Sequence, residues 1–217
     1  MSDPLVVAIT GASGAVYAKR LLEVLYHTGQ EVHLSISTSG RTVLREELGI
    51  EVDLNDFDRG LLVDGEIRAE DHRLLATIEL NQPIGQGQVR YFHQTDFMCP
   101  MASGSAKSRG MVVCPCSGGT LSGIVHGTSS NLIQRAAEVH LKERRKLILV
   151  PRETPLSLIA IDNMRKAAEA GAVVMPAMPG WYHGVTCLED LIDFMVARIL
   201  DQLDIPHALT QRWGADV

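Results

Sequence analysis

The stretch Leu147-Ile148-Leu149-Val150-Pro151-Arg152-Glu153-Thr154-Pro155 decides the fold of this chain. Its first four residues form a short apolar run, which is typical of a strand buried on both faces of a parallel sheet. The run stops at Pro151, and a cation, Arg152, and a carboxylate, Glu153, follow at once. In open α/β sheets, ligands bind just beyond the carboxyl ends of the strands. The stretch therefore predicts a parallel strand that carries two charged side chains to a ligand site.

Strand and helix patterns alternate on both sides of this stretch. Strands are expected at residues 5–9, 31–37, 89–93, 111–114, 147–150 and 172–175. Helices are expected at residues 15–27, 39–47 with Ser39 as N-cap, 121–126, 132–145 and 157–170, and after a capping box of Thr186 and Glu189. This order predicts a doubly wound parallel α/β sheet, Rossmann or flavodoxin-like. Without a linker or repeat, residues 1–217 are expected to form one domain.

The composition limits the classes of function. The formal net charge is −6, so the basic surface expected of a nucleic-acid-binding protein is missing. No apolar run has the length of a membrane span, and no signal peptide pattern precedes the first strand. The four cysteines lack the spacing of a metal or redox motif. We expect a cytoplasmic protein with buried free thiols and no metal site.

Two turns of small residues follow predicted strands. Gly11-Ala12-Ser13-Gly14 leads into the first helix, and Ser117-Gly118-Gly119-Thr120 follows the strand at residues 111–114. Backbone N–H groups at a helix start attract phosphate, and small residues allow close approach. Two such turns favour a mononucleotide or flavin site. A nicotinamide dinucleotide site is disfavoured, because the GxGxxG spacing is absent and Ser37, not an acid, ends the second strand.

Polar residues in the middle of the chain have two explanations each. Arg135, Glu138 and Lys142 share one face of a predicted helix, and a solvated ion-pair face accounts for that spacing. Ser103-Gly104-Ser105 fits a third anion-binding loop or a merely flexible segment.

Three further residues, Arg198, Tyr182 and Glu47, also have two interpretations each. Arg198 lies at the edge of an apolar stripe, so it either covers the core with its stem or reaches an anion. Tyr182 follows a glycine in a loop and fits either a substrate contact or a ring that caps the core. Glu47 follows Val43 and Leu44 and is a candidate proton-transfer group or a surface residue at a helix end.

Several short motifs follow one another along the chain. They are Thr10-Gly11-Ala12-Ser13-Gly14, Pro115-Cys116-Ser117 with Thr120, Asn131-Leu132-Ile133 with Arg135-Ala136-Ala137, Leu141-Lys142-Glu143-Arg144-Arg145, Val150-Pro151-Arg152-Glu153-Thr154-Pro155, Asn163-Met164, Tyr182-His183 and Arg212-Trp213-Gly214. In this order, the motifs closely resemble the UbiX family of flavin prenyltransferases. The resemblance covers nearly the whole chain and is weakest at residues 51–95.

The resemblance implies an enzyme that binds FMN without a metal. Such enzymes join a dimethylallyl group from dimethylallyl monophosphate to N5 and C6 of reduced FMN. The product, prenylated FMN, is the cofactor of UbiD-type decarboxylases, including those of ubiquinone biosynthesis. The family assembles as a dodecamer with its sites at subunit contacts.

The resemblance also implies a role for individual residues. Contacts to FMN would come from Gly11, Ala12, Ser13, Ser37, Ser117, Gly118, Gly119, Thr120 and Arg152. The donor phosphate would be held by Lys142, Tyr182 and Arg198, helped by Ser103, Gly104 and Arg135, and protons would be managed by Ser13, Glu47 and Glu153. The chain departs from the family at Trp181, where Phe is common, and at Gly118-Gly119, where larger residues are common.

Two other functions remain open at this point. A flavin-dependent cysteine-type decarboxylase would share the fold, but it would not need Lys142, Tyr182 and Arg198 to converge on a phosphate. A non-enzymatic FMN-binding protein would bind FMN without turning over a prenyl donor.

Overall fold

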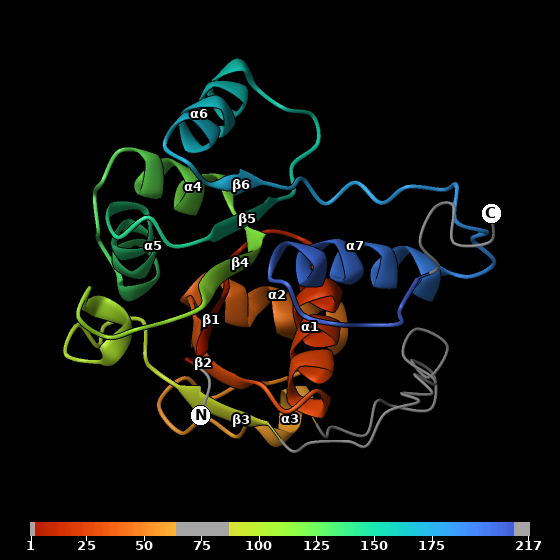
Figure 1. Cartoon of the computed structure of the whole chain (residues 1–217), viewed down its shortest axis with the longest axis horizontal. Coiled ribbons are helices and arrows are strands. Elements are labelled where there is room, and N and C mark those ends of the chain that lie inside the picture. The colour runs from red at the N-terminus through yellow and green to blue at the C-terminus, as the bar shows by residue number, and fades with distance from the viewer. Residues whose placement is uncertain (1–2, 64–86, 211–217) are drawn as a thin grey trace.

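The computed structural model describes residues 3–63 and 87–210. Within these ranges, all strands pair in parallel in one sheet, in the order β3-β2-β1-β4-β5-β6 (Figure 1). The strands are β1 (Leu5–Ile9), β2 (Glu31–Ile36), β3 (Gln88–Tyr91), β4 (Gly110–Cys116), β5 (Leu147–Pro151) and β6 (Val173–Val174). The doubly wound parallel fold predicted from the sequence is confirmed, with the strand order of a Rossmann sheet.

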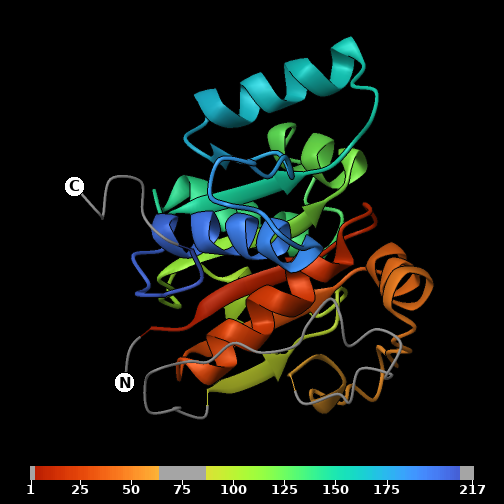
Figure 2. The same cartoon turned by 90° about the vertical axis from the view of Figure 1, so that its right-hand side faces the viewer.

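Helices cover both faces of this sheet (Figures 1 and 2). One face is packed by α1 (Ala15–His27), α2 (Thr38–Leu48), α3 (Gly60–Val63) and α7 (Leu188–Gln202). The other is packed by the short helix η1 (Pro100–Ala102), α4 (Gly118–Val125), α5 (Leu132–Lys142) and α6 (Leu158–Glu169). None of the helices in the described ranges is long and apolar enough to cross a membrane.

The side chains of β1 show how the sheet is buried on both faces. Leu5, Val7 and Ile9 belong to the core under α1 and α7, whereas Val6 and Ala8 belong to the core under α4 and α5. Successive residues of a strand point to opposite faces, so a strand covered on both sides needs a continuous apolar run. The same reason explains why the run at Leu147–Pro151 forms a central strand.

Two predicted helix caps are wrong by one or two residues. Ser37, not Ser39, caps α2, because its backbone N–H still bonds to Ile9 O of β1 at 3.0 Å while its hydroxyl accepts the N–H of Gly40 at 2.9 Å. At the start of α7, Cys187 takes the cap position and Asp190 replaces Glu189 as the capping carboxylate. In both cases a nearby residue that can also form hydrogen bonds lies three residues before the backbone N–H or carboxylate with which it pairs.

The helix predicted for residues 132–145 is shorter than expected. It ends at Lys142, and Arg144 adopts a left-handed backbone conformation with φ of 53°. A left-handed residue ends a helix. The chain then enters β5. Arg145, in the turn between α5 and β5, bonds to the loop that precedes β4.

Candidate functional site

The strand order reverses between β1 and β4, and two predicted ligand-binding turns meet there. β1 leads into α1 on one face of the sheet, and β4 leads into α4 on the other. Residues 10–14 and 117–120, here called the switch-point turns, therefore flank one crevice at the carboxyl edge. Ligands of doubly wound sheets bind in such a crevice.

A single buried hydroxyl joins the two switch-point turns. Thr10 is 1% exposed, and its Oγ1 donates to Pro115 O at 2.8 Å and accepts the N–H of Ser117 at 2.8 Å. The hydroxyl thus satisfies a carbonyl and an N–H from the end of β4. The sequence alone assigned Thr10 no role of its own. Its position at the start of a small-residue turn was the available signal.

The first switch-point turn is closed by a carboxylate from α2. The N–H of Gly14 donates to Glu47 Oε2 at 2.9 Å, and the N–H of Ala15 donates to the same atom at 2.8 Å. A negative charge at a helix N-terminus is favourable. The end of α1 that was expected to attract phosphate is therefore occupied by Glu47, an exposed residue. The carboxylate lies at the residue that follows Ser13, so two predicted proton-handling residues meet at this turn.

The second switch-point turn is open. Ser117 caps α4: its Oγ accepts the N–H of Thr120 at 3.3 Å and donates to Thr120 Oγ1 at 3.0 Å. A Cβ added to Gly118 or Gly119 would meet no atom within 4 Å. The first N–H groups of a helix lack intrahelical partners. The turn therefore presents backbone donors with free space around them, as an anion or a flat polar ring requires.

Arg152 brings a cation from the end of β5 to the same crevice. Its Nε donates to Ser13 O at 3.3 Å, which ties β5 to the first switch-point turn. Beside it, a cavity of about 340 Å³ opens between α4 and α6, with Gly118, Arg152 and Glu153 at its polar side. The remaining walls are mainly apolar, the composition usual for a small-molecule site. The Glu153 carboxylate is exposed and accepts the N–H of Thr154 at 3.1 Å.

Gly11 lets α2 approach the crevice closely. A Cβ on Gly11 would overlap the Cβ of Ser39, so no larger residue fits there without a shift. One sheet edge thus carries Gly11, Ala12, Ser13, Ser37, Glu47, Ser117, Gly118, Gly119, Thr120, Arg152 and Glu153.

A second group of predicted residues lies at the other end of the sheet. Lys142 ends α5, and the chain enters β5 at Leu147. Ser103 and Gly104 belong to the loop that leads into β4, so both segments lie at the amino edge. A Cβ on Gly104 would lie 2.7 Å from Lys142 Nζ, which shows that the loop and the end of α5 are in contact. Arg135, two turns earlier on α5, donates to the carbonyl oxygen before Ser103 at 3.1 Å.

Each cation of this second group is paired with a carboxylate of the chain. Arg135 lies 3.0 Å from Glu138, and Lys142 lies 2.5 Å from Glu143. The hydroxyl of Ser129 and the charge of Arg135 lower the pKa of Glu138, and Lys142 lowers the pKa of Glu143. The ion-pair interpretation of this helix face is confirmed for Arg135 and Glu138. A phosphate bound here has to compete with these carboxylates.

Arg198 belongs to α7, which packs on the opposite face of the sheet from α5, the helix that ends at Lys142 (Figures 1 and 2). The Tyr182 ring packs edge-on against Phe194 of α7, with centroids 5.7 Å apart. Arg198 follows one turn later on α7 and pairs with Asp201 at 2.7 Å, with half of its side chain exposed. One chain therefore does not bring Lys142, Tyr182 and Arg198 together.

All four cysteines are free thiols, and three of them are buried. Cys99, Cys114 and Cys116 are buried free thiols, as expected, and burial raises the pKa of Cys116 to about 12, whereas Cys187 is exposed. Among the residues that the structure describes, no group of three or more His, Cys, Asp or Glu side chains could hold a metal ion. The segment Arg212-Trp213-Gly214 lies outside the described residues.

Comparisons with known proteins agree on the kind of ligand. A family model described as Flavoprotein matches residues 2–201. A flavin prenyltransferase UbiX of Halalkalibacterium halodurans is 46% identical over 210 residues, which cover 97% of this chain and 93% of that protein.

The chain is also similar to solved structures of FMN-binding UbiX proteins. A structure of AnUbiX in complex with FMN and dimethylallyl pyrophosphate has 35% sequence identity and a TM-score of 0.77, and the match covers 99% of each chain. A dodecameric FMN-dependent UbiX-like decarboxylase from Escherichia coli O157:H7 has 34% identity and a TM-score of 0.76, with 98% of this chain and 100% of that chain covered. The FMN-dependent cysteine decarboxylase TvaF, at 17% identity, 80% and 90% coverage and a TM-score of 0.52, shares the fold alone.

Proposed function

This chain belongs to the UbiX family of flavin prenyltransferases, and we propose that it joins a dimethylallyl group from dimethylallyl monophosphate to N5 and C6 of reduced FMN. The observation that carries the proposal is the crevice between the two switch-point turns, which Thr10 holds together and which Gly118 and Gly119 leave open. The bound flavin supplies the nucleophilic ring atoms. The residues of the chain bind and orient the flavin and the donor, and they exchange protons with them.

The carboxyl edge has the groups that an FMN site requires. The open start of α4 offers N–H donors to a polar group, and Arg152 adds a fixed cation. The proposed contacts are Gly11, Ala12, Ser13, Ser37, Ser117, Gly118, Gly119, Thr120 and Arg152. The closure of α1 by Glu47 favours the start of α4 over the start of α1 as the place for a negatively charged group.

Cleavage of the allylic C–O bond requires that the leaving phosphate be stabilised. Fixed cations and hydroxyl donors around developing charge give this kind of stabilisation. We assign the role to Lys142, Tyr182 and Arg198, with Ser103, Gly104 and Arg135 as helpers. The second bond joins C6 to one alkene carbon of the attached prenyl group, so a proton has to add to the other alkene carbon, and C6 loses its proton to a positioned base. Ser13, Glu47 and Glu153 are the candidates, and the contact of Glu47 with Gly14 supports a shared role with Ser13.

The donor site is proposed to be shared between subunits of a homo-oligomer. Because Lys142 and the pair Tyr182 and Arg198 lie on opposite sheet faces, a neighbouring chain has to supply one of the two parts. Exposed apolar side chains support self-association. They are Leu158, Ile159, Ile161, Met178 and Trp181. A dodecamer like that of the Escherichia coli relative is the proposed assembly.

The proposed recipient of the product is a UbiD-type decarboxylase. Prenylated FMN would leave this enzyme as a product, so a second protein has to use it as a cofactor. The assignment follows from the family resemblance and from the product's chemistry.

The proposal is tested by anaerobic incubation of the protein with reduced FMN and dimethylallyl monophosphate, followed by mass spectrometry of the extracted flavin. A flavin heavier by one five-carbon prenyl unit is the expected result. Recovery of bound but unmodified FMN would instead favour a cysteine-type decarboxylase or a non-enzymatic FMN-binding protein. Dimethylallyl diphosphate in a parallel incubation compares the two donors.

A further inference from the structure

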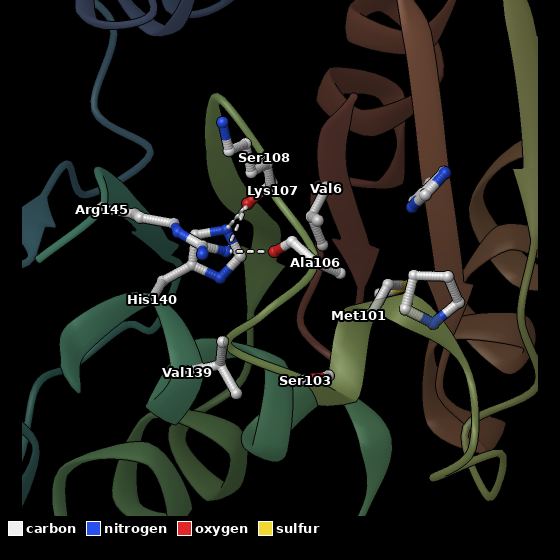
Figure 3. Close-up of a pocket in the computed structure, with 11 residues that line it drawn as sticks. Val6, Met101, Ser103, Ala106, Lys107, Ser108, Val139, His140 and Arg145 are labelled. Carbon is white, nitrogen blue, oxygen red and sulfur yellow. Dashed lines mark hydrogen bonds between the residues drawn. The ribbon is translucent and has the colours of Figure 1, made fainter. Parts of the chain in front are cut away.

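The loop of residues 103–108 is held in place by one side chain of α5, His140, and one from the turn that follows α5, Arg145 (Figure 3). The loop lies between η1 and β4 and forms neither helix nor strand. Its shape therefore depends on the groups that bind its polar atoms. Ser103 and Ser105 bond to each other within the loop, and His140 and Arg145 bind it from outside.

His140 holds the end of the loop through Ser108. The imidazole is 1% exposed, and its Nδ1 lies 2.7 Å from Ala136 O, so Nδ1 carries the proton and Nε2 accepts. Ser108 Oγ lies 2.8 Å from Nε2 and donates to it. Burial lowers the pKa of His140 more than its hydrogen bond to Ala136 O raises it, which favours the neutral ring that accepts this hydrogen bond.

Arg145 holds the middle of the loop through two carbonyl groups. Its Nη2 donates to Gly104 O at 2.6 Å, and its Nη1 donates to Ala106 O at 2.6 Å. The planar guanidinium fixes both carbonyls at once. Its own backbone N–H bonds to His140 O at 2.8 Å, so the two holding residues are also tied to each other. A cavity of only about 10 Å³ remains among the loop, η1 and α5.

The hydrogen bonds of His140 and Arg145 hold the loop that carries Ser103 and Gly104, two proposed contacts of the donor phosphate. Gly104 touches the end of α5 beside Lys142, although the two residues belong to different segments. We infer that His140 and Arg145 are positioning residues of the donor-phosphate site, which keep Ser103 and Gly104 beside Lys142. The inference rests on the proposed function, because it assumes that these three residues bind the donor.

Three substitutions separate the contact from the fold. Ser108→Ala removes only the loop side of the hydrogen bond. His140→Asn keeps a donor near the position of Nδ1 but cannot reach Ser108, whereas His140→Gln places an acceptor near the position of Nε2. We expect the KM for dimethylallyl monophosphate to rise about three- to tenfold in the first two variants and less in His140→Gln. The Kd for FMN should stay at the wild-type value, and residues 103–108 should exchange amide hydrogen faster.

His126 offers a matched control in the same chain. Its Nδ1 also lies 2.8 Å from the carbonyl oxygen four residues earlier, at Ser122, but it is exposed and is not a partner of the loop. His126→Asn should leave KM and loop exchange unchanged. Wild-type KM and wild-type exchange in folded Ser108→Ala and His140→Asn would overturn the inference. If the wild-type protein does not prenylate FMN, the proposed function fails, and with it the donor role of the loop, even where the exchange data show that His140 holds it.

Discussion

The two ends of the sheet differ in how far one chain prepares them for a ligand. At the carboxyl edge, the buried hydroxyl of Thr10 joins the two switch-point turns, Glu47 closes the first of them and the second stays open, all within one chain. At the amino edge, Lys142 is exposed and paired with Glu143, and its predicted partners lie on the other face. From this difference we propose that one subunit can organise the flavin site alone, whereas the donor site needs a neighbouring subunit.

The largest expected effect is on the donor site. Replacing Lys142 with Met, Tyr182 with Phe or Arg198 with Met should each slow prenyl transfer by about a hundredfold or more, because each removes a group that stabilises the leaving phosphate. The Kd for FMN, measured by fluorescence quenching, should not change. Product formation is measured by mass spectrometry of the flavin after single-turnover reactions.

Arg45→Met serves as the control for loss of a cation. Arg45 is an exposed cation paired with Glu46 at 2.6 Å, and it has no place in the proposed site. Its loss should leave product formation unchanged. Normal prenylation in the Arg198→Met and Tyr182→Phe proteins would remove these residues from the donor site.

The next largest effect is expected at the contact between α2 and α1. In Glu47→Gln, an amide oxygen can still accept the N–H groups of Gly14 and Ala15, but the negative charge and the proton acceptor are lost. FMN should bind with its wild-type Kd. The rate of product formation should fall about a hundredfold, because the proposed proton-transfer group is lost. A time course of prenylated FMN measures this, and a wild-type yield and rate would exclude Glu47 from the mechanism.

Thr10→Val tests the link between the switch-point turns. Val has the shape of Thr but removes the hydroxyl from Pro115 O, which keeps only the N–H of Thr10, and from the partly buried N–H of Ser117. We expect the free energy of unfolding to fall by about 1–3 kcal/mol and the FMN Kd to rise by about tenfold. Thr10→Ser keeps the hydroxyl and should recover most of the affinity. Equal FMN affinity in the Val and Ser variants would show that the link does not organise the flavin site.

The smallest effect concerns the start of α7, which carries the Arg198 part of the donor site. The backbone N–H groups of Thr186 and Cys187 hold the pKa of Asp190 at about 2, below its ordinary value. A lowered carboxyl pKa stabilises the fold above its ordinary pKa of about 3.9, and the effect is lost as the pH falls toward 2. Asp190→Asn should therefore reduce the free energy of unfolding at pH 7 by at most about 1 kcal/mol, because the site is exposed. Urea unfolding should show this difference shrinking below about pH 4, and a difference independent of pH would contradict the assignment.

Most of the fold could be predicted from the sequence, because local pattern and global packing agree. The apolar runs at Leu5–Ile9 and Leu147–Pro151 are buried on both faces, as interior strands of a parallel sheet require, and their sequences predict this directly. Helix caps were less predictable. Ser37 and Ser39 have the same chemistry, and only the bond from Ser37 N–H to Ile9 O selects the first of them.

The candidate site could be predicted as a set of residues but not as an arrangement. The turns after Ile9 and Cys116 follow from the strand pattern, and the topology alone brings them together. That Thr10 links the turns, or that His140 and Arg145 fix a loop more than thirty residues away, depends on contacts that no local pattern encodes. The separation of Lys142 from Arg198 depends on which sheet face each helix covers.

The measurement that decides whether the donor site is shared uses mixed oligomers. Subunits with Lys142→Met and subunits with Arg198→Met are coexpressed in equal amounts with different tags, and assemblies that contain both are purified. If the two residues of one site come from different subunits, about one quarter of the sites regain both, so about one quarter of wild-type prenylation should return. If both residues came from the same chain, no site would regain the pair, and activity no higher than that of either parent variant would contradict the account.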